Sequence, residues 1–292
     1  MPTESHSFKR LVLGLQPNAP DRSMQLAVEL AELLNLELLG LFLEDANLRN
    51  LAGIPFAREF RPLGGGWQPI DLTRLTRDLE LAARSAERLF ADAAKRLSTS
   101  YQFEVIRGLT AETIASVSRT GDIVMVFEPV SAAERATQQF AWLIEAAFRS
   151  AAAVMLVPTH ITRTTGPVVA IVTAPDDPGL DAAAAFANAA EEELVVVEAY
   201  AGAADDPRIR NLAAETGLTI RRVATGRALP SDPKAFLPAF HELQERLVVV
   251  TRGVLTGDLA LTIASARAVP VLVVEPPERI DGGVPPRSQT AA

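Results

Sequence analysis

The chain has 292 residues, 48% of them hydrophobic and 22% charged, which is typical of a globular protein with room for two domains of roughly 150 residues each. Its formal net charge of -8 and pI near 5.1 argue against a surface that neutralises nucleic-acid phosphates. The sequence contains no cysteine, which excludes a disulfide framework, a zinc–thiolate site and a thiol nucleophile.

The N-terminal ten residues lack the apolar core of a signal peptide. The longest apolar segment, residues 141–158, is interrupted by Glu145 and Arg149 and is therefore a poor membrane span. We expect a cytoplasmic protein that neither inserts into a membrane nor binds nucleic acid.

The first 158 residues alternate strand and helix patterns. Strands are predicted at residues 10–15, 37–42, 103–107, 122–127 and 154–157, and helices at residues 21–34, 71–97, 110–119 and from 131 to about 150. An irregular piece, residues 44–68, interrupts the alternation and is expected to cover an edge of the sheet. This order predicts a doubly wound α/β fold with a parallel sheet and helices on both faces.

The central strand of this first series ends at a turn that is a natural place for a ligand. Glu128 and Pro129 stop the strand, and Ser131 with Glu134 three residues later is typical of a capping box that opens a helix. In open α/β sheets ligands bind at such strand-to-helix turns. No glycine lies between Gly121 and Gly166, so the turn lacks the residue that usually lets backbone N–H groups approach a phosphate.

The series then repeats. Strands are predicted at residues 168–172, 194–198, 218–223, 247–250 and 271–274. Asp177, Asp206 and Asp232 each precede a proline, which predicts three capped helix starts, and Asp258 is the expected cap of a fourth helix. The predicted organisation is a first domain at 1–160, a linker at 161–166, a shorter second domain at 167–276 and a disordered tail at 277–292.

Several stretches of the first half resemble the universal stress protein family in a tandem form. They are RLVLGL, LAVELAELL, LELLGLFLEDANLRNLAGIPFARE and YQFEVIRGLTAET, and the resemblance covers most of residues 9–158. It implies two five-stranded parallel sheets, each in the strand order 3-2-1-4-5. It also implies that the fifth strands, residues 154–157 and 271–274, pair edge to edge as an intramolecular pseudo-dimer. A homodimer is a further possibility.

The resemblance also implies an ATP or AMP site, with magnesium, in some family members. Those members carry an aspartate after the first strand, where this chain has Gln16, and a G-x-x-G pattern after the fourth strand, where it has Glu128 to Ser131. The second half has Gly253 and Gly257 there, spaced by three residues rather than two. We expect no bound cofactor in the first half, and the second half keeps the best remaining candidate turn.

The remaining candidate ligand residues lie at ends of predicted strands. Gln16 and Asn18 flank the turn after the first strand, and Glu44 with Asp45 follows the second as either a ribose or cation ligand or a solvated turn. In the second half Thr251, Arg252, Gly253, Gly257 and Asp258 form the candidate turn, with an arginine suited to an anion. The three histidines show no metal-binding spacing, and residues 64–66 (GGG) are interpreted as a lid or plain loop.

Three classes of function follow from these observations. The first is a non-catalytic stress-response module that acts through protein partners, which the eroded phosphate turns favour. The second is an adenine-nucleotide sensor or slow ATPase that uses the second half. The third is a cytosolic regulatory subunit of a transporter. No catalytic residue is predicted.

Overall fold

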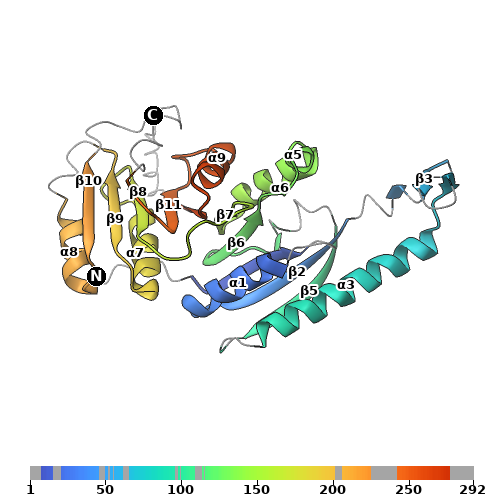
Figure 1. The fold of residues 1–292 in the computed structure, drawn as a ribbon, viewed down its shortest axis with the longest axis horizontal. Coiled ribbons are helices and arrows are strands. Elements are labelled where there is room, and N and C mark those ends of the chain that lie inside the picture. The colour runs from blue at the N-terminus through green and yellow to red at the C-terminus, as the bar shows by residue number, and fades with distance from the viewer. Residues whose placement is uncertain are drawn as a thin grey trace, which may run out of the picture.

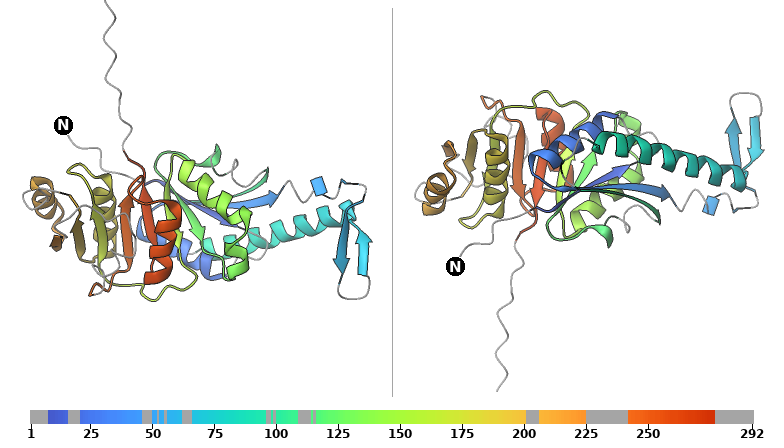
Figure 2. Two further views of the ribbon diagram at one scale, coloured as in Figure 1. Left: turned by 90° about the horizontal axis from the view of Figure 1, so that it is seen from above. Right: turned by 90° about the horizontal axis from the view of Figure 1, so that it is seen from below.

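The structure is a computed structural model, and it describes residues 8–15, 21–45, 50–51, 53–54, 56–61, 66–95, 98, 100–108, 114, 116–200, 206–224 and 242–276. Within these residues one ten-stranded sheet runs through the molecule with helices on both faces (Figure 1). A long helix carries a small two-stranded sheet away from this body (Figure 2). Among the described helices, none combines the length and the apolar character that a membrane span requires.

The first half of the sheet has the predicted topology. Its strands are β1 (Arg10–Leu15), β2 (Glu37–Asp45), β5 (Tyr101–Gly108), β6 (Asp122–Phe127) and β7 (Ala153–Val157). They are parallel and lie in the order β5-β2-β1-β6-β7, which is the expected 3-2-1-4-5. The helices whose bounds the described residues give are α1 (Asp21–Leu33), α3 (Leu72–Ala94), α5 (Ala132–Arg135) and α6 (Gln138–Arg149).

The second half repeats this topology with shorter elements. Its strands are β8 (Val168–Val172), β9 (Leu194–Glu198), β10 (Ile220–Ala224), β11 (Leu247–Thr251) and β12 (Val271–Val274). They lie in the order β10-β9-β8-β11-β12, again 3-2-1-4-5. The described helices are α7 (Pro178–Ala190), α8 (Pro207–Thr216) and α9 (Gly257–Arg267).

The two halves join through their fifth strands, as the resemblance implied. β7 and β12 pair antiparallel, with Val271 opposite Leu156, Leu272 opposite Met155 and Val273 opposite Val154. Every other pairing in this sheet is parallel. The pairing removes two edge strands that would otherwise present free backbone groups.

The sheet separates two apolar cores. Along β1, Leu11 and Leu13 face one core and Val12 faces the other, because successive strand side chains point to opposite faces. The first core is covered by α1, α3, α7 and α8, and the second by α6 and α9. The inner strands β6, β7, β8, β9, β11 and β12 are buried on both faces, which explains their nearly unbroken apolar sequences, whereas the edge strands β5 and β10 are more exposed.

Two helix starts differ from the sequence prediction. The single helix expected from residue 131 to about 150 is divided into α5 and α6, and α6 has its own cap, Thr137. Asp177 caps α7 by accepting from the Gly179 N–H, and Asp206 caps α8 in the same way. Asp232 lies outside the described residues. The expectation for Asp258 was wrong, because α9 is capped by Thr256, whose hydroxyl accepts from the Leu259 N–H, and Asp258 lies inside the first turn.

The piece between β2 and α3 differs most from expectation. β2 continues to Asp45, so Glu44 and Asp45 belong to a strand rather than to a turn. Beyond it, β3 (Arg58–Arg61) and β4 (Gly66–Pro69) form an antiparallel hairpin. This hairpin lies at the far end of α3 and does not cover the sheet edge (Figure 1). The helix itself begins after its Asp71 cap and ends at Ala94.

A contact between β2 and α3 generates a stability prediction. A Cβ atom on Gly40 would lie 2.8 Å from the Phe90 ring, whereas one on Gly14 in β1 would meet no atom within 4 Å. Gly40→Ala should lower the free energy of unfolding by about 1–3 kcal/mol through overpacking. Gly14→Ala is the matched strand control and should change it by less than about 0.5 kcal/mol. Urea denaturation measures both values, and equal effects would contradict this account of the packing.

Candidate functional site

The crevices where strand order reverses lie between β1 and β6 in the first half and between β8 and β11 in the second. Ligands of open α/β sheets bind beyond the carboxyl ends of these strands. Glu128 follows β6 and Arg252 follows β11, so the two residues occupy equivalent positions. Their backbone N–H groups make matching hydrogen bonds, Glu128 to the Val157 carbonyl at 2.8 Å and Arg252 to the Val274 carbonyl at 2.7 Å.

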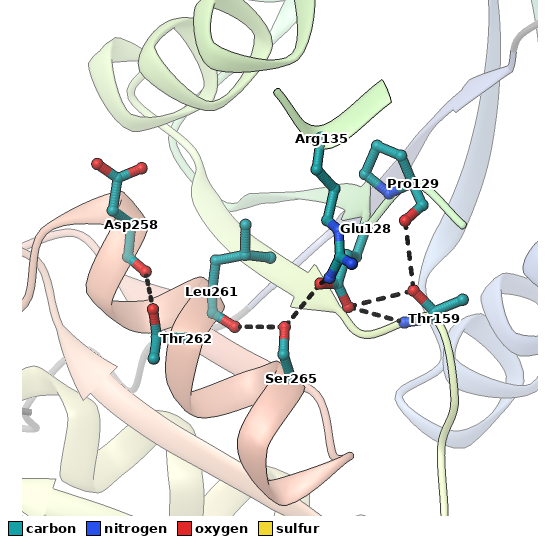
Figure 3. Close-up of polar contacts among 8 residues, drawn as sticks. All are labelled: Glu128, Pro129, Arg135, Thr159, Asp258, Leu261, Thr262 and Ser265. Atoms are coloured by element: carbon teal, nitrogen blue, oxygen red, sulfur yellow. Dashed lines mark hydrogen bonds and ion pairs between the residues drawn. The ribbon is translucent and has the colours of Figure 1, made fainter. Parts of the chain in front are cut away.

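The Glu128 side chain is buried at 7% exposure and fills the turn of the first half. Its Oε1 accepts from the Arg135 guanidinium at 2.6 Å and from the Ser265 hydroxyl at 2.8 Å. Its Oε2 accepts from the N–H and hydroxyl of Thr159, at 3.1 and 3.2 Å (Figure 3). Ser265 belongs to α9, so this carboxylate connects the two halves of the chain.

Hydrogen bonding decides the ionisation of this carboxylate. Burial alone would raise the pKa of Glu128, but the hydrogen bonds from Ser265, Thr159 and Arg135 outweigh it and hold the pKa below its ordinary value. An open hollow of 480 Å³ lies beside it, lined by Glu128, Arg135, Leu261, Thr262, Ser265 and Ala266. The wall of this hollow therefore carries the buried, ionised carboxylate of Glu128, and each of its oxygens already accepts two hydrogen bonds.

Arg252 fills the equivalent turn of the second half. Its guanidinium donates to the carbonyls of Ser150 at 2.6 Å and Ala152 at 2.5 Å, and it forms an ion pair with Glu275. It also lies 5.8 Å from the centre of the Phe148 ring. Burial lowers the pKa of Arg252, and Glu275 opposes this effect. The arginine predicted to meet an anion is thus held by the first half of the chain.

Other residues of the second turn serve packing. Thr251 donates to the buried Asp177 carboxylate and accepts from the Gly179 N–H at 3.2 Å, which closes the crevice between β8 and β11. Asp177 also accepts from the N–H and hydroxyl of Thr173. A Cβ atom on Gly257 would lie 2.7 Å from Ile144 of α6, so this glycine lets α9 approach α6.

The remaining candidates are scattered. Gly253 adopts a positive φ of 90° in the turn, and Asp258 contributes its backbone carbonyl to a hydrogen bond from Thr262. Ser131 accepts from the Glu134 N–H at 3.0 Å and caps α5 as predicted. Glu44 forms an ion pair with Arg107 of β5. Gln16, Asn18 and the Asp45 side chain lie outside the described part of the structure.

Two partners of these residues were not predicted. No sequence motif marks Ser265 as a partner of Glu128. The two residues are 137 positions apart in sequence, and the pairing of β7 with β12 brings their halves together. Asp177 was predicted as a helix cap, and its second role with Thr251 depends on the neighbouring strand. No group of three or more potential metal ligands occurs among the described residues. His160 is exposed, and His6 and His241 fall outside the described ranges.

The Glu128 network predicts a pH-dependent contribution to stability. Because its pKa is lowered in the folded state, the stabilisation is present above the ordinary pKa of glutamate, near 4.3, and is lost as the pH falls through the folded-state value. Glu128→Gln should cost about 1.5–3 kcal/mol at pH 7 and progressively less below pH 4. Urea denaturation between about pH 3 and 7 measures the difference.

Glu134→Gln is the matched control, since Glu134 is an exposed carboxylate on the adjacent short helix. It should change the free energy of unfolding by less than about 0.5 kcal/mol at any pH in this range. A cost for Glu128→Gln that does not diminish in acid would contradict the assignment of the network.

Comparison with known proteins identifies the fold. No protein-family model and no curated protein matches the chain. A universal stress protein from Archaeoglobus fulgidus DSM 4304 is 12% identical, with a TM-score of 0.64 over 92% of this chain and 97% of that one. A functionally unknown protein from Pseudomonas aeruginosa PAO1 is 16% identical, with a TM-score of 0.50 over 93% of this chain and 94% of that one. The chain therefore has the fold of a universal stress protein in its tandem form.

Proposed function

We propose that this chain is a non-catalytic regulatory module of the stress-protein type that acts through contacts with other proteins. We also propose that it binds no adenine nucleotide at the turns after β6 and β11, which are the fourth strands of the two halves. The observation that carries the proposal is the buried Glu128 carboxylate at the end of β6. It stands where the resemblance places the phosphates of ATP in nucleotide-binding members.

The donors that a phosphate would need in the first half are already engaged. The Thr159 N–H, the Ser265 hydroxyl and the Arg135 guanidinium all point at Glu128 (Figure 3). A phosphate here would have to displace a carboxylate of the same charge and leave it buried without partners. Each lost charge-assisted hydrogen bond is worth about 1.5–3 kcal/mol, or roughly a tenfold to hundredfold loss of affinity.

The second half supports the same proposal by a different route. Arg252 has the charge that an anion requires, but its guanidinium is committed to two backbone carbonyls and to Glu275. Releasing it would leave the carbonyls of Ser150 and Ala152 without these donors in the interior. If the second half bound an adenine nucleotide through Arg252, the contact between the two halves would therefore have to rearrange.

A transporter-regulating subunit is one form of the same proposal, with an integral membrane protein as the partner. It requires only an exposed protein-binding surface on this chain.

Thermal unfolding with and without millimolar ATP and magnesium tests the absence of nucleotide binding. A ligand at 100 times its Kd stabilises the folded state by about 2.7 kcal/mol, and one present at its Kd by only about 0.4 kcal/mol. We expect no measurable rise in Tm with ATP or AMP, with magnesium alone as the reference.

A clear rise in Tm with ATP that is lost in Arg252→Gln would contradict the proposal and place a nucleotide site in the second half. A rise that survives this change but is lost in Arg135→Gln would contradict it in favour of the hollow beside Glu128. Each variant is compared with its own melting curve without ligand, so its intrinsic stability does not affect the conclusion.

A further inference from the structure

An apolar pocket of 230 Å³ lies at the junction of the two halves. Its walls come from α1 of the first half, from α7 and β11 of the second half, and from the segment that connects β7 to β8. Its apolar lining includes Leu26, Leu30, Met155, Ile161, Phe186 and Leu247. A molecule bound in this pocket would therefore contact both halves and their connection.

The pocket is separate from the turns after β6 and β11. Val168 and Leu247 of its lining are the first residues of β8 and β11, whereas Arg252 follows the last residue of β11. The pocket thus lies at the opposite end of these two parallel strands. It also lies on the other face of the sheet from the hollow beside Glu128. Its six apolar residues belong to or pack against the first core, whereas Leu261 of the hollow packs against the second.

One guanidinium in the pocket is not used by the fold. Arg246, immediately before β11, lines the pocket and is half-buried. It lies 3.9 Å from Glu192, which is too far for a hydrogen bond, and its side chain donates no hydrogen bond to a residue that the structure describes. Glu192 accepts instead from the Gly166 N–H at 2.9 Å. The N–H groups of Arg246 are therefore left to water or to a ligand.

Arg163 also lines the pocket, but its guanidinium has a structural task. It donates to the backbone carbonyl of Glu245 at 2.9 Å and to that of Arg267 at 3.0 Å. These bonds fix the segment between β7 and β8 to the second half. Arg163 therefore shapes the wall, and Arg246 is the group available to a ligand.

The lining favours a ligand with a compact apolar body and one anionic end. A cavity of about 150 Å³ already accommodates benzene, so 230 Å³ has room for a ring with a short side chain. A carboxylate can accept two parallel hydrogen bonds from a guanidinium. Glu29 of α1 is an exposed residue of the lining, and together with Glu192 it disfavours a more highly charged group such as a phosphate.

We propose that this pocket binds a small monocarboxylate with an aromatic or branched aliphatic body. Its carboxylate pairs with Arg246, and its apolar body lies between α1 and α7. Because the ligand contacts both halves, its binding stabilises their junction. This small-molecule site is additional to the proposed protein-binding role and does not rest on it.

Calorimetric titration of the full chain with 3-phenylpropanoate tests the proposal, with 3-phenylpropanamide as the uncharged analogue of the same shape. We expect the carboxylate to bind with a Kd on the order of 1 mM or tighter, as for a ligand of about 11 non-hydrogen atoms. The amide should bind at least about tenfold more weakly, because it cannot form a charge-assisted pair with Arg246. An absence of carboxylate binding at about ten times the expected Kd would overturn the proposal, and so would equal Kd values for the two compounds.

The role of Arg246 is tested by Arg246→Gln. This change should raise the Kd of the carboxylate by about tenfold or more and that of the amide by less than about threefold. Arg221→Gln is the matched control, because Arg221 of β10 forms an ion pair with Glu193 and does not line the pocket. It should leave both Kd values within about twofold. A carboxylate Kd that Arg246→Gln leaves unchanged would overturn the assignment.

The charge of the ligand is tested from the other side of the pocket. Glu29→Gln removes a like charge and should lower the Kd of the carboxylate by about two- to threefold. A rise in this Kd would overturn the proposed ligand class in favour of a cationic ligand.

The location is tested by filling the pocket. Ala190 lines it, so Ala190→Phe should abolish binding, whereas Ala189→Phe places the same ring on the neighbouring residue of α7, which does not line it. Ala189→Phe should leave the Kd of the carboxylate within about twofold, and melting curves establish that each variant is folded. Binding that survives Ala190→Phe would overturn the location. The ATP experiment reports on Arg252 and Arg135 instead, so failure of either proposal leaves the other intact.

Discussion

The antiparallel pairing of β7 with β12 is the contact on which the rest of the molecule depends. It turns two five-stranded sheets into one sheet and protects the two most exposed edges. It also brings the turns after β6 and β11 into contact with elements of the opposite half. Glu128 receives a hydrogen bond from Ser265 of the second half, and Arg252 donates to carbonyls of the first.

The turns after β6 and β11 both contribute to the junction between the two halves. Glu128 and Arg252 occupy the same backbone position, with the same hydrogen bond to the fifth strand, but carry opposite charges. Glu128 is buried and Arg252 is half-buried. Each forms an ion pair within its own half, Glu128 with Arg135 and Arg252 with Glu275. The hydrogen bonds across the junction add further partners to these paired charges.

Much of the fold was predictable because the inner strands are buried on both faces and their apolar residues are continuous. The alternation of strand and helix patterns was sufficient for a doubly wound parallel fold, whereas the strand order of each half came from the family resemblance. The end of β2 was missed because Glu44 interrupts the apolar pattern, although Glu44 pairs with Arg107 of β5 in the sheet. A single sequence does not show such cross-strand compensation.

The hairpin of β3 and β4 was missed for a different physical reason. Its exposed Phe60 and Trp67 look like core residues, and its proline and glycine residues look like a loop. Thr256 was missed as the cap of α9 because Asp258 is an equally good capping residue two positions later. Glu128 and Arg252 lie at strand ends, as their sequence positions indicated, but two of their partners, Ser265 and Ser150, lie more than 100 residues away in sequence and became visible only in three dimensions.

The joint between β7 and β12 also has a consequence for synthesis of the chain. β7 ends at Val157 and β12 begins at Val271, so about 115 residues must follow before the partner strand exists. At 5–20 residues per second a ribosome needs roughly 6–23 s for this interval. Throughout that time the first half can fold with an apolar strand edge open to solvent and to neighbouring nascent chains. Protection of that edge during translation is therefore a requirement that the finished molecule no longer shows.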